Sequence, residues 1–248
     1  LLFYAGLISV ATIYSQEKEK SWMMGPFERP SDAQPILQKD SKSSFKDPIT
    51  GETSHWESMA TFNPAAIVKN GTIHVFYRAE EKLGDKEIGG HRSRIGLAVS
   101  KDGASYSKKA APVFYPGPDN QKGNEWPGGT EDPRIVETSE GLYVLTYTQW
   151  NREVPRLAVA TSKDLVHWEK HGPVFQKHKN GQYLNRETKS GAIVTELKDG
   201  KLVAAQINGK YWMYWGDTDI FVCTSENLID WTPLEKEGEL IKMFSPRK

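Results

Sequence analysis

The tetrapeptide Glu131-Asp132-Pro133-Arg134 is the part of the sequence with the clearest capacity for chemistry. Adjacent carboxylates on an extended strand point to opposite sides, so one can face a ligand while the other supports it. Arg134 carries a planar guanidinium that can hold a carboxylate or a substrate oxygen. Gly128-Gly129, directly before the motif, lets the backbone approach closely. The motif alone leaves two interpretations open: a catalytic acid pair, or a solvated loop with a local ion pair.

Three polar segments occupy corresponding places in the sequence. They emerge when the strand-like runs are aligned on Ile67, Ile135 and Ile193. The segments are Phe62-Asn63-Pro64, Thr130-Glu131-Asp132-Pro133-Arg134 and Thr188-Lys189-Ser190-Gly191. Packing alone does not explain polar residues where a buried strand favours apolar ones. The alignment predicts that the three segments contribute to one site.

The elements that must position these segments repeat along the chain. Each copy is a strand-like run that ends in a serine turn, with an aromatic ring six residues after the serine; the pairs are Ser100 with Tyr106, Ser162 with Trp168, and Ser225 with Trp231. Successive serines are 62 and 63 residues apart. A period of this size, made of strands and turns, is typical of a β-propeller with one four-stranded blade per repeat. In such a fold, the inner strands meet at the mouth of the central channel, where we expect the ligand site.

Three blades are legible between residues 60 and 240, whereas a closed ring needs at least four. We therefore expect an all-β propeller of which about three to four blades are present, in a chain that is a fragment without its last blade or two. The expected boundaries are a partial signal peptide at 1–15, an extended lead-in that wraps the propeller at 16–60, and an incomplete catalytic propeller at 61–248.

The first fourteen residues form an apolar run that is followed at once by charged residues. This pattern is typical of a secretory signal peptide, with a buried N-terminal strand as the alternative. It predicts a periplasmic or secreted protein that has no membrane contact once the signal is removed.

Composition limits the classes of partner. At 248 residues and 38% apolar content, the chain can bury the core of one domain. Its 32 basic and 32 acidic residues balance, which argues against nucleic acid as a partner. Cys223 is the only cysteine, so no internal disulfide exists. The six histidines show no ligand spacing, and we expect neither a catalytic metal nor a cofactor. The sequence does not disclose the oligomeric state.

Several motifs, in order over about residues 60–232, resemble those of glycoside hydrolase family 130. They are Phe62-Asn63-Pro64-Ala65-Ala66-Ile67, Tyr77-Arg78-Ala79-Glu80, Arg94-Ile95-Gly96-Leu97-Ala98, Gly129-Thr130-Glu131-Asp132-Pro133-Arg134, Tyr147-Thr148 with Arg156-Leu157-Ala158, and Ile207-Asn208-Gly209-Lys210-Tyr211. The resemblance implies a five-bladed propeller that acts on β-mannosides by inverting hydrolysis or by phosphorolysis. It further implies that Asp132 is the general acid, often relayed through a sugar hydroxyl, and that Asn63, Arg78 and Arg134 line the mannose subsite.

The two reactions need different second components. Phosphorolysis needs a basic cluster for inorganic phosphate as co-substrate, whereas hydrolysis needs a second carboxylate that activates water. The candidate cations are Arg156, Arg186 and Lys189; the candidate bases are Glu187, Asp217 and Asp219. The phosphorylases of this family usually have an acidic, proline-containing segment where this chain has Lys189-Ser190-Gly191. In an exported enzyme, phosphorolysis would also conserve no bond energy, because the sugar phosphate would form outside the cytoplasm. Both points favour hydrolysis.

The predicted site therefore combines a catalytic pair with a set of substrate-binding side chains. Asp132 and Glu131 are the catalytic pair, and the substrate-binding set is Asn63, Arg78, Arg94, Arg134, Trp150, Arg156, Lys189, Tyr214 and Asp217. The expected partner is an oligosaccharide or glycan, over whose rings aromatic side chains can stack. A carbohydrate-binding propeller without catalysis is the alternative from a different class.

Overall fold

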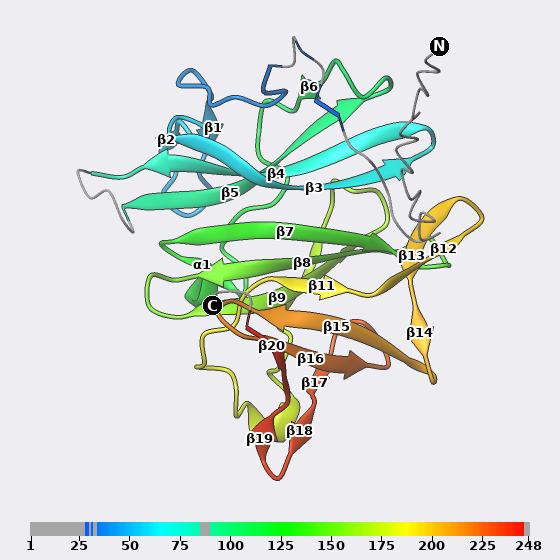
Figure 1. Ribbon diagram of the computed structural model, residues 1–248. Coiled ribbons are helices and arrows are strands. Elements are labelled where there is room, and N and C mark those ends of the chain that lie inside the picture. The colour runs from blue at the N-terminus through cyan, green and yellow to red at the C-terminus, as the bar shows by residue number, and fades with distance from the viewer. Residues whose placement is uncertain (1–27, 30, 32–33, 85–89, 246–248) are drawn as a thin grey trace, which may run out of the picture. The chain divides into compact units, whose positions relative to one another are not determined.

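The computed structural model describes residues 28–29, 31, 34–84 and 90–245 (Figure 1). The predicted signal peptide and the first part of the predicted lead-in lie outside the described residues. The chain divides into two compact units, Leu1–Pro35 and Ile36–Lys248, and the strands all belong to the second. Within the described ranges, no helix has the length and apolar character needed to cross a membrane.

The first blade is an antiparallel sheet of four consecutive strands, visible in cyan and green in Figure 1. Its strands are β3 (Ala60–Lys69), β4 (Thr72–Lys82), β5 (His91–Ser100) and β6 (Ser107–Lys108). Asn70 and Gly71 join β3 to β4 with φ values of 50° and 70°. Two positive φ values in succession match the twist of a two-residue hairpin, for which Asn-Gly is a favoured sequence.

The second blade repeats this design and is linked to the first. It contains β7 (Gly129–Glu137), β8 (Tyr143–Trp150), β9 (Pro155–Ser162) and β10 (Glu169–Pro173), preceded by the short helix α1 (Lys122–Glu125). Ser93 of β5 pairs with Gly129 of β7 in parallel orientation. Gly129 has a φ of 128°, and a Cβ atom there would lie 2.2 Å from the Ser93 carbonyl oxygen. Glycine is therefore required where the two blades meet.

The third blade differs from the first two in its strand order. Its sheet contains β11 (Gly191–Ile193), β15 (Lys210–Gly216), β16 (Ile220–Ser225) and β17 (Trp231–Pro233), with β14 (Gln206–Ile207) and β20 (Lys242–Phe244) at its margins. Asp199 and Gly200 form the turn of a separate hairpin of β12 (Thr195–Lys198) and β13 (Lys201–Ala204). The second strand of this blade is thus β15, because β13 instead meets β7 of the second blade at Val203 and Glu137. The remaining short elements are β1 (Phe45–Lys46), β2 (Thr53–Ser54), η1 (His178–Asn180), β18 (Glu235–Lys236) and β19 (Glu239–Leu240).

The serine turns have the same hydrogen bonds in all three blades. In the second blade, the Ser162 hydroxyl accepts from the backbone amides of Asp164 and Leu165, and the Asp164 carboxylate accepts from the Val166 amide. The turns at Ser100 and Ser225 repeat this pattern. Such side-chain bonds end a strand and start a turn. The predicted β-propeller type of fold is confirmed, while the number of blades in the whole propeller stays a prediction.

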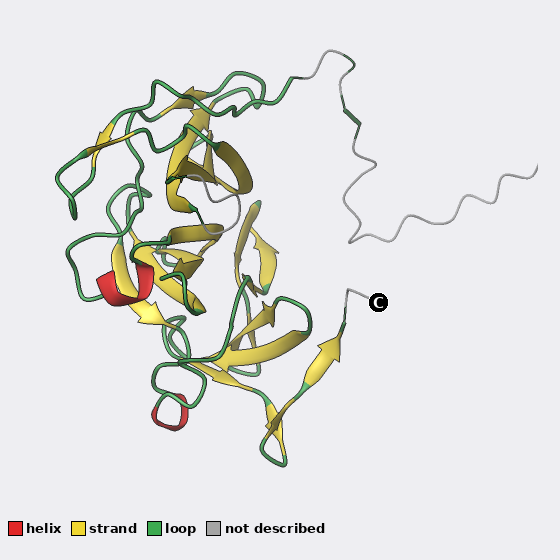
Figure 2. Cartoon of the chain, turned by 90° about the vertical axis from the view of Figure 1, so that its left-hand side faces the viewer, coloured by secondary structure: helices red, strands yellow, loops and turns green. Residues whose placement is uncertain are grey.

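Apolar side chains fill the spaces between the sheets, whose stacking is seen in Figure 2. One buried cluster joins the first and second blades and includes Phe76, Leu97 and Leu145. Another joins the second and third blades and includes Leu157 and Trp215. Side chains alternate between the two faces of a sheet, so each sheet can bury one face against each neighbouring sheet.

The segment before the first blade packs on that blade through one large ring. The Trp56 side chain is 0% exposed and stacks on Tyr77 with ring centroids 6.3 Å apart. Asp47, after the β1 strand, accepts a hydrogen bond of 2.5 Å from the Arg94 guanidinium. An apolar contact and a buried ion pair therefore hold this segment on the propeller.

Replacement of Trp56 by alanine tests that contact. We expect Trp56→Ala to lower the free energy of unfolding by about 3–5 kcal/mol, because a large buried ring leaves a cavity that its neighbours cannot fill. Urea denaturation followed by circular dichroism measures the change, with the half-buried Trp212→Ala as control. A loss below about 1 kcal/mol for Trp56→Ala would show that the segment is not anchored by this ring.

Candidate active site

Near the start of each of the three inner strands, a polar residue lies in the left-handed backbone region. The φ values are 46° at Asn63, 50° at Asp132 and 46° at Ser190. The β3–β4 and β7–β8 pairings shift register at Asn63 and Asp132, so both residues lie in β-bulges. Residues other than glycine have a strained backbone in this region, and such residues are often found at functional positions. The structure thus gives the three aligned polar segments the same unusual backbone.

The Arg78 guanidinium joins the acidic residues of this region into one cluster. Its Nη1 donates to Asp132 Oδ1 at 3.0 Å, and its Nη2 donates to Glu131 Oε1 at 2.8 Å and to Glu80 Oε1 at 2.5 Å. Its Nε donates to the Ser93 hydroxyl at 3.2 Å. Burial lowers the pKa of Arg78, but the three carboxylates around it outweigh burial and raise it. The guanidinium is thus a fixed positive charge at the junction of β4, β5 and β7.

Asp132 is held in its ionised form by this cluster. Its Oδ1 also accepts a hydrogen bond of 2.7 Å from Asn63 Nδ2, which crosses from the first blade to the second. Burial raises the pKa of Asp132, but the charge of Arg78 and the hydrogen bonds from Asn63 and Arg78 outweigh it. The pKa of Asp132 is therefore lowered, and Lys189 adds to the effect.

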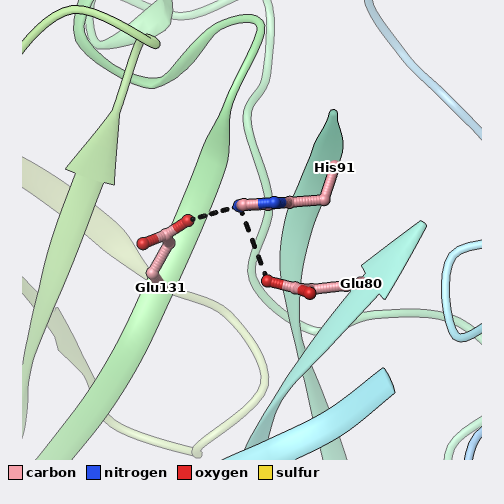
Figure 3. Close-up of side chains that lie close together, drawn as sticks. All are labelled: Glu80, His91 and Glu131. Carbon is pink, nitrogen blue, oxygen red and sulfur yellow. Dashed lines mark hydrogen bonds and ion pairs between the residues drawn. The ribbon is translucent and has the colours of Figure 1, made fainter. Parts of the chain in front are cut away.

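His91 lies beside the same carboxylates, as Figure 3 shows. Its Nε2 is 3.4 Å from Glu131 Oε1 and 3.5 Å from Glu80 Oε1. Glu80, His91 and Glu131 are close enough together to hold a metal ion. Arg78 Nη2, however, lies 3.2 Å from His91 Nε2 and bonds both carboxylates, so the guanidinium already supplies positive charge at that point.

A cavity of about 310 Å³ adjoins the cluster. Its lining combines charged, aromatic and apolar side chains: Arg78, His91, Glu131, Trp150, Pro155, Glu187, Lys189 and Asp217. The structure thus brings five predicted residues to one cavity, Arg78, Glu131, Trp150, Lys189 and Asp217, and places Asn63 and Asp132 in the cluster beside it. A cavity that combines charged groups with the aromatic ring of Trp150 suits a polyhydroxylated ligand.

Other residues of the predicted set lie elsewhere. Arg94 is fully buried and paired with Asp47 and Glu81, and it does not line the cavity. Arg156 donates to the Leu184 carbonyl at 2.8 Å and to Asn185, and it does not line the cavity.

Arg134 and Tyr214 are also outside the cavity lining. Arg134 donates to the Pro133 carbonyl and lines a larger, mostly apolar groove of about 760 Å³ between the inner strands of the three blades. Tyr214 is 43% exposed on β15.

No role was predicted for Glu80 or His91 from the sequence, although one signal was available for Glu80. It follows Arg78 by two residues in a strand, so both side chains lie on the same face. His91 enters the cluster only through the pairing of β5 with β4.

Asn63→Gly tests how the cluster ionises Asp132, since glycine suits the φ of 46° while the Nδ2 donor is lost. We expect the pKa of Asp132 to rise, because burial remains and one of the groups that lower it is gone. Carbon-13 NMR titration of the Asp132 carboxyl measures the change. Asn70→Gly, at a φ of 50° in an exposed hairpin turn, is the matched control.

The lowered pKa of Asp132 also determines how the stability of the fold depends on pH. A lowered folded-state pKa means that ionised Asp132 stabilises the fold above the unfolded value of about 3.9. This contribution is lost as the pH falls through the folded-state pKa, and Asn63→Gly should lose part of it. An unchanged Asp132 titration in Asn63→Gly would exclude the proposed influence of Asn63.

Comparison with known proteins identifies related sequences. The chain matches the family model described as beta-1,4-mannooligosaccharide phosphorylase over residues 28–247. A 1,2-beta-oligomannan phosphorylase of Thermoanaerobacter sp. (strain X514) is 35% identical over 182 residues, which cover 72% of this chain and 53% of the relative. The chain therefore spans about half the length of that curated relative.

Solved structures of similar proteins share the fold. A glycosyl hydrolase from Bacteroides ovatus has 51% identity and a TM-score of 0.89, over 93% of this chain and 64% of its own. A second structure has 51% identity and a TM-score of 0.88 over 92% of this chain and 64% of its own. It was described with the finding that the GH130 family of mannoside phosphorylases contains glycoside hydrolases that target β-1,2 mannosidic linkages in Candida mannan. The family match and these relatives show that the chain belongs to glycoside hydrolase family 130, which contains both phosphorylases and hydrolases of β-mannosidic linkages.

Proposed function

We propose that this protein is an exported glycosidase that cleaves β-mannosidic linkages of glycans by an inverting mechanism, with Asp132 as the general acid. One observation carries the proposal: Asp132 lies in a strained bulge, bound to Arg78, beside a cavity that also contains Glu187 and Asp217. Inverting hydrolysis uses one carboxyl group at the leaving oxygen and another that activates water on the opposite face of the sugar. The apolar run at 1–14 supports export to the periplasm or the medium.

A general acid must carry a proton, whereas Asp132 is ionised in the unliganded protein. Sugar hydroxyls that take over the hydrogen bonds of Asn63 and Arg78 leave the Asp132 carboxylate with fewer donors and less water around it. Both changes raise the pKa of a buried carboxyl group. Substrate binding thus favours the protonated form, and a sugar hydroxyl can pass the proton to the leaving oxygen.

Glu187 and Asp217 are the candidates for the base that activates water, because both line the cavity. Asp219, the third candidate from the sequence, instead accepts a hydrogen bond of 2.5 Å from Ser245 and lies 3.6 Å from Lys242. Its carboxylate is engaged with the end of the third blade.

Phosphorolysis is the second candidate reaction, and two observations favour it. Lys189 lines the cavity, and the curated relative is named a phosphorylase. The other two predicted cations lie apart: Arg156 binds the chain at 184–185, and the Arg186 guanidinium lies 5.9 Å from the Tyr183 ring centroid. Since only one of the three lines the cavity, the arrangement supports attack by water.

Product analysis separates the two reactions. We expect β-mannobiose and longer β-mannosides to release free mannose at the same rate with and without inorganic phosphate. Chromatography of the products measures this. Mannose 1-phosphate that forms only in the presence of phosphate would contradict hydrolysis and assign Lys189 to the phosphate site.

Substitution of the carboxylates tests their roles. We expect Asp132→Asn to lower kcat by about 10²–10⁴-fold while sugar binding persists, since a general acid contributes a factor of that size. Glu187→Gln and Asp217→Asn identify the base, with Asp219→Asn as the control that retains turnover. Wild-type protein that binds mannosides without turnover would instead indicate a carbohydrate-binding propeller.

A further inference from the structure

We propose that Glu80 and His91 are positioning residues that hold the Arg78 guanidinium between Glu131 and Asp132, an inference that rests on the proposed function. Glu80 and His91 lie on the same side of the cluster in Figure 3 and reach it from β4 and β5, while Glu131 comes from β7. Arg78 is therefore surrounded by groups from both blades.

Hydrogen-bond geometry shows how Glu80 acts through Arg78. A guanidinium is a rigid planar fork, and Nη2 carries two hydrogens. Glu80 and Glu131 accept from Nη2 at 2.5 Å and 2.8 Å, which uses both hydrogens. Because the fork is rigid, these two bonds also fix Nη1, which donates to Asp132. Glu80 thus sets the position of Asp132's main cationic partner.

The contacts of His91 indicate the part that it plays. The side chains of Glu80, Glu131 and Asp132 are 7%, 5% and 11% exposed, and they share one guanidinium that is 9% exposed. Buried charge without a partner is costly, so the position of this guanidinium matters to all three carboxylates. His91 Nε2 lies within 3.5 Å of both Glu80 and Glu131 and 3.2 Å from Arg78 Nη2, so the imidazole packs against the groups that hold the guanidinium.

The other charged groups near His91 make different contacts. Arg152 donates to the His91 backbone carbonyl, and Arg92 lies nearest Asp47 and Glu81. Glu187, Lys189 and Asp217 line the cavity beside His91. The imidazole thus contacts Glu80 and Glu131 from the β5 side, next to the Arg78 guanidinium.

The test compares Glu80→Gln, Glu80→Asp and His91→Gln with the wild type and with His74→Gln. His74 is a matched control, because it is a half-buried histidine on β4 that bonds only the Thr72 carbonyl among the described residues. The measurements are kcat and KM for β-mannobiose from pH 4 to 9, with thermal melting to verify folding. The titration of the Asp132 carboxyl by carbon-13 NMR gives a readout that does not depend on activity.

We expect Glu80→Gln to lower kcat/KM at least about tenfold, because a neutral amide oxygen replaces a charged acceptor of the Arg78 guanidinium. Less of the Arg78 charge is then neutralised, so Asp132 should titrate at lower pH, whereas Glu80→Asp should keep the wild-type titration. His91→Gln should lower kcat/KM and change the Asp132 titration, whereas His74→Gln should leave both as in the wild type.

Two outcomes would overturn the inference. One is a folded His91→Gln variant whose kcat/KM and Asp132 titration match those of the wild type; the other is a folded Glu80→Gln variant in which Asp132 titrates as in the wild type. Failure of the proposed function looks different: the wild type would then release no product from any mannoside, while the Asp132 titrations of the variants would still report on the cluster.

Discussion

The Arg78 guanidinium binds Asp132, Glu131 and Glu80 at once, and the geometry of the site depends on this shared cation. Arg78 and Glu80 belong to the first blade, whereas the other two carboxylates belong to the second. The cluster therefore forms only where the two blades meet, close to the pairing of Ser93 with Gly129. Any change in how the blades pack would alter which carboxylate receives the charge of Arg78.

The ion pairs of this cluster are by themselves weak evidence of a contribution to stability. Apolar side chains of similar volume often stabilise a protein as well as a buried ion cluster does. The left-handed backbone at Asn63 and Asp132 adds strain, of order 1–3 kcal/mol at each residue. The apolar clusters between the blades and the fully buried Trp56 supply the packing that keeps this strained, charged region in place.

Strand alternation explains why Arg78 and Arg94 belong to different clusters. On β5, His91 and Ser93 point to the Arg78 cluster, whereas Arg92 and Arg94 point to the other face and meet Asp47 and Glu81. A side-chain period of two makes this separation unavoidable. Arg94 therefore anchors the segment that precedes the first blade, and its presence in a recognisable motif reflects stability.

The sequence by itself determined the blade repeat, the serine turns, the polar segments at the starts of the inner strands and the resemblance to family 130, because each depends on local spacing. The resemblance also implied that Asp132, Asn63 and Arg78 belong to one site, but not the bonds between them. Only the tertiary structure decided which face of β5 turns to the site, that β15 rather than β13 completes the third blade, and that Glu80 and His91 join the cluster. These features depend on strand register and on contacts between blades, which bring together residues far apart in the chain and leave no local pattern to read.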